Sequence, residues 1–137
     1  MTVTNLRKLS YHYTNICPQM PVNFFDRDGN PTQTFNDAIL DSGAATVAIP
    51  KWLADELDLH LKKRPQKGKS AGGEVDVYTT TANFNLGRGG IFVNYTNVEI
   101  SVLETLDSIL IGMVPVFEDF LVTIDGKRKK ILLEPRK

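Results

Sequence analysis

Short apolar runs that alternate with polar residues, bounded by clusters of turn-forming residues, recur along most of this chain. Alternation of this kind predicts β-strands with one face turned toward a core. The runs fall at residues 21–25, 34–40, 75–86, 91–102, 109–112, 120–124 and 130–134. Residues 50–59 favour a helix, because a proline starts the segment and two leucines lie four residues apart. Residues 114–119 are long enough for one or two helical turns. We therefore predict a mainly β fold, a small closed or sandwich-like domain with one or two short helices.

Turn signals connect these strands. Residues 26–31 read Asp-Arg-Asp-Gly-Asn-Pro and predict a hairpin between the first two runs. Asp125-Gly126 predicts a two-residue turn in the last hairpin. The apolar phase shifts by one residue at Thr96-Asn97, which predicts a bulge or a bend. Residues 62–73 are polar, basic and glycine-containing, so we expect a mobile loop or a hairpin tip there.

Length and charge limit the possible functions. The chain of 137 residues suits one domain with its own core, and its sixteen basic and sixteen acidic residues balance. No overall charge therefore attracts nucleic acid or an anionic membrane. The single cysteine, Cys17, excludes an intrachain disulfide, and residues 1–10 lack the apolar core of a secretory signal. We expect a cytoplasmic protein without a membrane or nucleic-acid partner.

The sequence does not indicate a metal site or a phosphate site. His12 and His60 lack the helical spacing of a zinc protease, and the aspartates within residues 26–31 lack the spacing of an EF-hand loop. Gly68-Lys69-Ser70 lacks the leading glycine of a phosphate loop, because Lys63 occupies that position. We therefore predict neither a metal nor a cofactor.

The run at residues 34–40 leads directly into Asp41-Ser42-Gly43, which is followed by the small residue Ala44. A strand end can hold a carboxylate in place, and a glycine after it lets the backbone approach closely. Taken alone, the tripeptide also fits a plain turn after a buried strand.

Four segments, in this order, resemble the retropepsin-like single-lobe aspartic proteases, most closely their small bacterial and archaeal relatives. They are Leu40-Asp41-Ser42-Gly43-Ala44, residues 47–53, Ala71-Gly72-Gly73, and Leu110-Ile111-Gly112 followed by a closing strand at residues 120–125. The resemblance covers roughly residues 20–135 and implies a closed acid-protease β-barrel lobe. It divides the chain into an N-terminal extension, residues 1–20, which adds a strand, and a single retropepsin-like domain, residues 21–137.

The resemblance implies a role for each segment. Asp41 would be the catalytic residue, Ser42 would hydrogen-bond across a two-fold axis, and the small residues 43–44 would permit close packing of the loop. Leu110-Ile111-Gly112 would pack beneath this loop and fix its position. Ala71-Gly72-Gly73 would form the tip of a flap over the substrate, although the residues alone equally allow a plain surface loop.

The Asp-Ser-Gly segment occurs once in the chain, so a site with two carboxylates requires a second copy. Two carboxylates within hydrogen-bond reach share a proton, and the pair then serves as base and acid toward a water molecule. The resemblance thus implies a homodimeric aspartic endopeptidase that acts on extended peptide or protein segments. Two alternatives stay open: a non-catalytic dimer of this fold that binds peptides or a protein partner, and a protease that dimerises only within a larger assembly.

Overall fold

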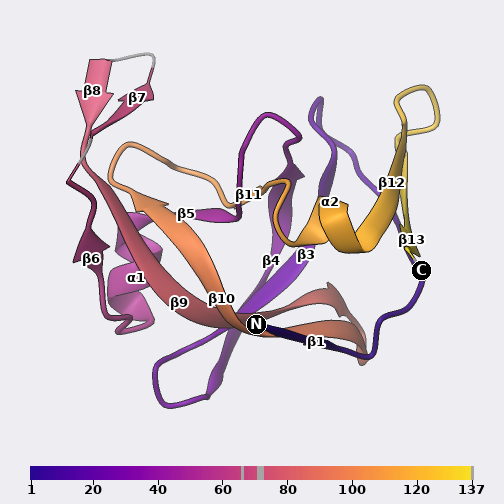
Figure 1. Cartoon of the computed structure of the whole chain (residues 1–137). Coiled ribbons are helices and arrows are strands. Elements are labelled where there is room, and N and C mark those ends of the chain that lie inside the picture. Colours follow the sequence, from indigo (N-terminus) through magenta and orange to yellow (C-terminus); the bar gives the residue numbers. More distant parts are fainter. Residues whose placement is uncertain (66, 71–72, 137) are drawn as a thin grey trace.

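Six strands close into a barrel in the computed structural model, which describes residues 1–65, 67–70 and 73–136 (Figure 1). These strands are β3 (Gln19–Phe25), β4 (Pro31–Leu40), β5 (Ala48–Pro50), β9 (Val77–Arg88), β10 (Ile91–Leu103) and β11 (Leu110–Ile111). Around the ring the order is β10, β5, β11, β4, β3 and β9, and β9 pairs back with β10. The predicted fold, a closed and mainly β barrel lobe with short helices, is confirmed.

The long hairpin of β9 and β10 forms one wall of the barrel. Its turn consists of Gly89 and Gly90, whose φ angles of 68° and 83° lie in the left-handed region that glycine adopts without a steric penalty. Further along, the register shifts between Tyr95 and Val98, and Asn97 has a φ of 55°. The predicted change of apolar phase is therefore a β-bulge. The predicted hairpin of β3 and β4 is also confirmed.

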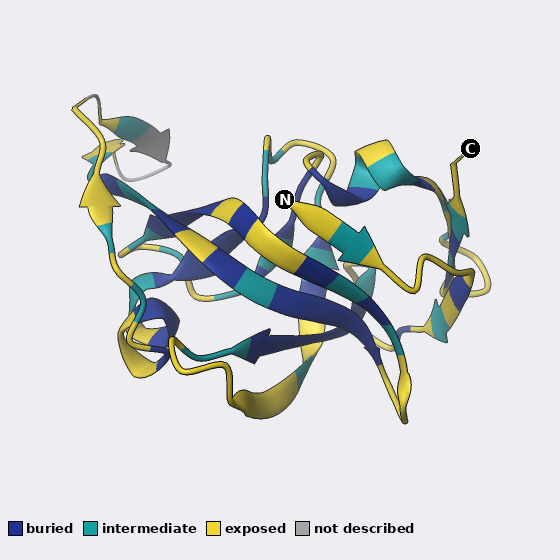
Figure 2. Cartoon of the chain, turned by 60° about the horizontal axis from the view of Figure 1, so that its bottom comes forward, coloured by how far each residue is buried: buried dark blue, intermediate teal, exposed yellow. Residues whose placement is uncertain are grey.

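Aliphatic and aromatic side chains from several strands fill the core. Phe24, Phe84 and Tyr95 are almost completely buried. The ring centroid of Phe84 lies 5.4 Å from that of Phe24 and 5.1 Å from that of Tyr95. At this spacing aromatic pairs add to the stabilisation that burial provides. Figure 2 shows the buried positions concentrated in the central strands, where they alternate with exposed ones, and mostly exposed positions in the loops and hairpin tips.

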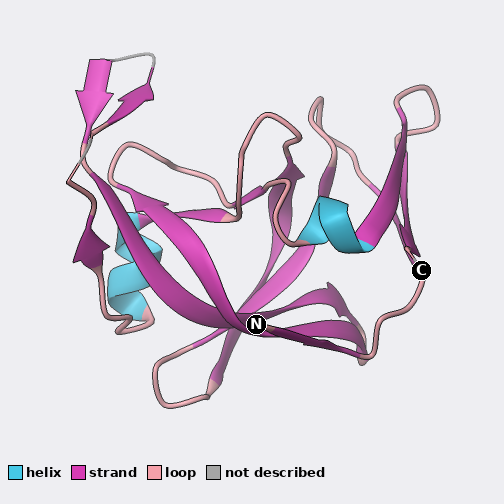
Figure 3. Ribbon diagram, viewed as in Figure 1, coloured by secondary structure: helices cyan, strands magenta, loops and turns pink. Residues whose placement is uncertain are grey.

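Short helices follow two of the strands (Figure 3). α1 (Lys51–Glu56) begins directly after Pro50, whose backbone is extended, and it is shorter than the predicted segment at residues 50–59. It ends early because Asp58 takes a φ of 55° and turns the chain away. α2 (Val116–Asp119) confirms the short helix predicted within residues 114–119. In the described part of the chain no helix is long and apolar enough to cross a membrane.

A second sheet contains the strands β12, β13 and β2, in that order. Their bounds are Phe120–Asp125 for β12, Lys130–Pro135 for β13 and Leu9–His12 for β2. The prediction of a two-residue turn between β12 and β13 is wrong, because Asp125 pairs with Lys130 and leaves residues 126–129 in the turn. The Asp125 carboxylate accepts hydrogen bonds from the backbone N–H groups of Lys127 and Arg128, and this side-chain capping stabilises the longer turn.

The N-terminal segment contributes to both sheets. β1 (Thr2–Thr4) pairs antiparallel with β10, and β2 pairs antiparallel with β13. The segment between β2 and β3 then connects two distant places in the fold. At one end Tyr13 N–H donates to Lys129 O, and at the other Leu40 N–H donates to Pro18 O, each over 3.0 Å. The segment thus links the β12–β13 turn to the end of β4.

Replacing Tyr95 by Phe should lower the free energy of unfolding by about 1 kcal/mol. The Tyr95 hydroxyl donates to the Asp119 carboxylate over 2.9 Å and so joins β10 to the end of α2. Burial and the nearby Asp119 carboxylate raise the pKa of Tyr95. The wild-type protein should therefore lose stability as the pH rises above about 10, where the unfolded tyrosine ionises and the folded one does not. Tyr95→Phe should lose less stability over that range.

Urea unfolding at neutral and at alkaline pH measures both effects. Tyr78→Phe is the matched control, because the Tyr78 hydroxyl is partly exposed and lies 3.4 Å from Glu104. We expect that control to unfold like the wild type. Equal stability of the wild type and Tyr95→Phe would contradict the prediction.

Candidate active site

Asp41 is the first residue after β4 and lies beside β11. Its backbone N–H donates to Ile111 O over 3.0 Å, and Ile39 N–H donates to Ile109 O over 2.9 Å. Parallel pairing of β4 with β11 thus continues to the aspartate itself. The Asp41 side chain is half-buried, and Ser42 next to it is exposed. A carboxylate is therefore presented at the surface from a well-anchored strand end.

The turn after Asp41 orients its carboxylate. Gly43 N–H donates to Asp41 Oδ1 over 2.8 Å, and Ala44 N–H donates to Asp41 O over 3.2 Å. A Cβ at position 43 would lie 3.1 Å from Asp41 Oδ1, closer than an ordinary van der Waals contact. Glycine therefore allows the backbone amide to reach the carboxylate without pressing on it.

Gly112 lies directly beneath the loop. A Cβ at this position would come within 2.2 Å of Thr46 O and 2.6 Å of Ala44 O, distances that no carbon atom can occupy. The next two residues fix the position of the Asp41 loop through backbone hydrogen bonds. Met113 N–H donates to Ala44 O over 2.8 Å, and Val114 N–H donates to Ala45 O over 3.0 Å. The structure thus brings the Leu110-Ile111-Gly112 element and the Asp41 loop together.

Thr46 is a further residue of the loop that the sequence analysis did not single out. Its hydroxyl lies 3.1 Å from Val114 O and 3.3 Å from Glu99 O, so it connects the loop to both β10 and the segment after β11. Val114 is 68 residues away along the chain, and Glu99 is 53 residues away. No local pattern could have revealed them.

A hairpin of β7 (Gly68–Ser70) and β8 (Gly73–Val75) stands where the resemblance places a flap. Gly73 begins β8 with a φ of 113° and pairs with Ser70. Ala71 and Gly72, the other two predicted tip residues, lie outside the described residues. Figure 1 shows this hairpin at the same side of the molecule as the loop after β4. At its base β6 (Lys62–Lys63) pairs with β9, and Lys63 Nζ lies 3.4 Å from Asp76 Oδ2.

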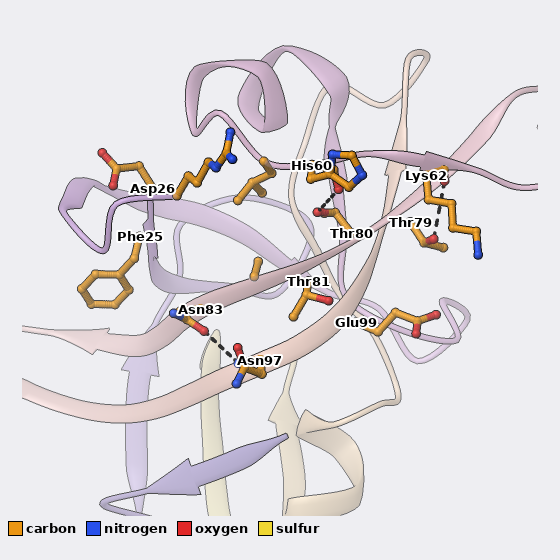
Figure 4. Close-up of a pocket in the computed structure, with 13 residues that line it drawn as sticks. Phe25, Asp26, His60, Lys62, Thr79, Thr80, Thr81, Asn83, Asn97 and Glu99 are labelled. Atoms are coloured by element: carbon orange, nitrogen blue, oxygen red, sulfur yellow. Dashed lines mark hydrogen bonds between the residues drawn. The ribbon is translucent and has the colours of Figure 1, made fainter.

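A separate cavity of about 480 Å³ lies away from Asp41, between β9, the segment after α1 and the turn that joins β3 to β4 (Figure 4). Several of its polar side chains already bind the backbone. The Thr80 hydroxyl donates to His60 O over 2.7 Å, and the Asn83 side chain accepts from Asn97 N–H over 2.8 Å. The hydrogen bonds of Thr80 and Asn83 hold the wall of the barrel together. The lining of the cavity contains both carboxylates, those of Asp26 and Glu99, and several cationic side chains.

Metal ligands do not gather anywhere in residues 1–65, 67–70 and 73–136: no group of three or more His, Cys, Asp or Glu side chains is close enough to hold an ion. The Asp41 loop itself presents a positioned carboxylate, which can take or give a proton.

A closed six-stranded barrel with Asp-Ser-Gly at the end of one strand and a glycine-ended strand beside it defines the retropepsin-like class of fold. Residues 21–114 match the model of the family described as aspartyl protease, and the chain belongs to that family. A search of the curated proteins finds no match.

Solved structures agree with this class of fold. The chain is similar to a retropepsin-like aspartic protease from Rickettsia conorii, with a TM-score of 0.68 and 21% identity over 94% of this chain and 100% of that one. It is also similar to EIAV protease complexed with the inhibitor HBY-793, with a TM-score of 0.50 and 15% identity over 79% of this chain and 92% of that one. The resemblance to retropepsin-like aspartic proteases that the sequence indicates is confirmed.

Proposed function

We propose that the protein is a homodimeric aspartic endopeptidase that hydrolyses peptide bonds in extended segments. The observation that carries this proposal is the half-buried Asp41 carboxylate, presented at the end of β4 and oriented by the Gly43 amide. One Asp-Ser-Gly segment per chain supplies half of a two-carboxylate site. A two-fold axis through the loop would bring the second half from another copy.

In the proposed reaction a water molecule lies between Asp41 and the partner's Asp41. The ionised carboxylate takes a proton from the water as the water oxygen attacks the carbonyl carbon of the peptide. The protonated carboxyl group gives its proton to the carbonyl oxygen. The C–N bond of the tetrahedral intermediate then breaks as a proton passes to the amine leaving group.

The surrounding elements suit this chemistry. The exposed Ser42 would hydrogen-bond across the two-fold axis, and Ala44 keeps the loop close to Met113. The β7–β8 hairpin would close over the substrate as a flap and exclude water. An extended peptide between the hairpin and the loop would bind through its backbone, and alternate side chains would occupy pockets.

Cleavage of a diverse peptide pool tests the proposal, with the wild type and Asp41→Asn compared at equal concentration from about pH 3.5 to about pH 7.5. We expect cleavage by the wild type alone and strongest on the acidic side, because one carboxyl group must be protonated while the other is ionised. Equal cleavage by both proteins would exclude Asp41 as the catalytic residue. Absence of cleavage by a confirmed dimer would favour the alternative, a non-catalytic dimer that binds peptides.

A further inference from the structure

We propose that a cavity between the N-terminal segment and the tip of the β9–β10 hairpin binds a phosphate ester. The cavity has a volume of about 500 Å³, and pockets for small molecules measure roughly 300–1,000 Å³. Figure 1 shows the tip of this hairpin beside the chain that leaves β1. None of the residues that line the cavity belongs to the Asp41 loop. The proposal therefore adds a second site and does not depend on the protease function.

Three cationic side chains line this cavity, and no carboxylate lines it. They are Arg7 and Lys8, from the chain between β1 and β2, and Arg88, at the end of β9. Within the described part of the chain none of the three forms an ion pair, because the ion pairs there involve other cations. The chain as a whole carries no net charge, so the excess of positive charge is a local property of this cavity. Such an excess attracts an anion.

Tyr11 lies between the two arginines. The Arg88 guanidinium is stacked on its ring, with 5.5 Å between Cζ and the ring centroid. Burial raises the pKa of Tyr11, and the charges of Arg88 and Arg7 oppose that rise, so both charges act on the hydroxyl group. Asn36 Oδ1 accepts a hydrogen bond from Arg88 Nη1 over 3.0 Å. The Arg88 side chain is thus held in place, and its remaining N–H groups can donate to a ligand.

The Tyr11 hydroxyl is a further donor at the cavity. It lies close to the backbone of β9, since a Cβ on Gly87 would come within 3.2 Å of its oxygen. Among the described residues this hydroxyl has no hydrogen-bond partner. A phenol held against a strand, with no protein acceptor, can donate to an anion that enters the cavity.

The donors and charges favour a phosphate over a carboxylate. A phosphate monoester carries nearly two negative charges and three terminal oxygens, and arginine binds such a group through two parallel hydrogen bonds. A carboxylate carries one charge and two oxygens, so it would leave more of the cationic groups without a partner. Ile91, which is 47% exposed, also lines the cavity and would contact the organic part of the ester.

Titration calorimetry of the full chain with phenyl phosphate tests the proposal. Arg7→Gln combined with Lys8→Gln should weaken binding by about tenfold or more, because two of the three cations are lost. Lys62→Gln combined with Arg64→Gln is the matched control: it removes the same two types of charge from an exposed segment elsewhere. The control should bind like the wild type. Equal weakening in both double variants, or no binding by the wild type, overturns the proposal.

Benzoate tests the preference for phosphate, because it has the same ring with a carboxylate in place of the phosphate. We expect benzoate to bind about tenfold more weakly or less tightly still. Equal binding of the two compounds overturns the assignment to a phosphate ester.

Tyr11→Phe distinguishes a formed site from a diffuse positive surface. The substitution keeps the ring beneath Arg88 and all three charges, and removes one hydrogen-bond donor. It should weaken the binding of phenyl phosphate by about fivefold. Tyr78→Phe, on the other side of the hairpin strand pair from this cavity's lining residues, should leave the affinity unchanged. An unchanged affinity in Tyr11→Phe overturns the proposed site.

A phosphate ester can belong to a soluble molecule or to a lipid headgroup, and vesicles distinguish the two sources. Co-sedimentation with phosphatidylcholine vesicles that contain phosphatidic acid, lost in the Arg7 and Lys8 double variant, would assign the ester to a headgroup. Binding of phenyl phosphate without binding to these vesicles would assign it to a soluble molecule. Binding to neither overturns the proposal. Cleavage by Asp41 has no part in these measurements, so the protease function and this site are tested separately.

Discussion

Asp41→Asn should lower the rate of peptide cleavage by about a hundredfold or more, because the amide can neither accept the proton of the water nor donate one to the carbonyl oxygen. The substitution keeps the size of the side chain, and its Oδ1 can still accept from Gly43 N–H. The variant should therefore fold and dimerise like the wild type. The measurement is the initial rate of cleavage of the best substrate from the peptide pool. Asp37→Asn is the control, since Asp37 is exposed on β4 and should not affect the rate.

Mixing the two proteins examines whether the site needs both chains. With three Asp41→Asn chains for each wild-type chain, activity per wild-type chain should fall to about a quarter, because random pairing leaves only that fraction in fully wild-type dimers. An activity that follows the amount of wild-type chain alone would show that one carboxylate is enough. That result would contradict the two-carboxylate reaction.

Gly112→Ala should destabilise the protein by about 3 kcal/mol or more and lower its melting temperature by about 10 °C. The added methyl group would meet two backbone oxygens, those of Thr46 and Ala44, which cannot rotate away as a side chain would. Relief of this clash requires the Asp41 loop to move away from β11. The rate of peptide cleavage should therefore fall even at temperatures where the variant is folded. Calorimetry and the cleavage assay measure the two effects.

Gly126→Ala is the control for this substitution. Gly126 lies in the β12–β13 turn, and a Cβ there would meet nothing within 4 Å. Its stability should stay close to that of the wild type. A Gly112→Ala variant as stable and as active as Gly126→Ala would show that the loop tolerates a large shift, contrary to the close packing described above.

Local signals in the sequence predict much of the fold. Turn residues identify the β3–β4 hairpin, alternating apolar residues identify the strands β9 and β10, and the phase shift at Thr96-Asn97 identifies the bulge. The Asp41 loop and its glycine-ended neighbour are also visible, because both are short motifs with distinctive residues. In each case the residues that determine the structure are close together in the chain.

Features that depend on distant contacts could not be predicted in this way. The β12–β13 turn is longer than expected because Tyr13 N–H, from the segment after β2, binds Lys129 O, in addition to the local cap by the Asp125 carboxylate. Thr46 holds the Asp41 loop because its hydroxyl binds carbonyl groups of β10 and of Val114. Pairing of β5 with both β10 and β11, which closes the barrel, likewise joins segments far apart in the sequence.

The pairing of Asp41 with Ile111 also has a consequence for how the protein is made. The carboxylate loop precedes β11 by about seventy residues, so a ribosome that has synthesised the loop has not yet made the strand that holds it. While the intervening residues are being added, Asp41 therefore lacks its support. The Asp41 loop can take its folded position only when residues 110–114 have emerged, so the order of the segments delays the formation of the candidate site.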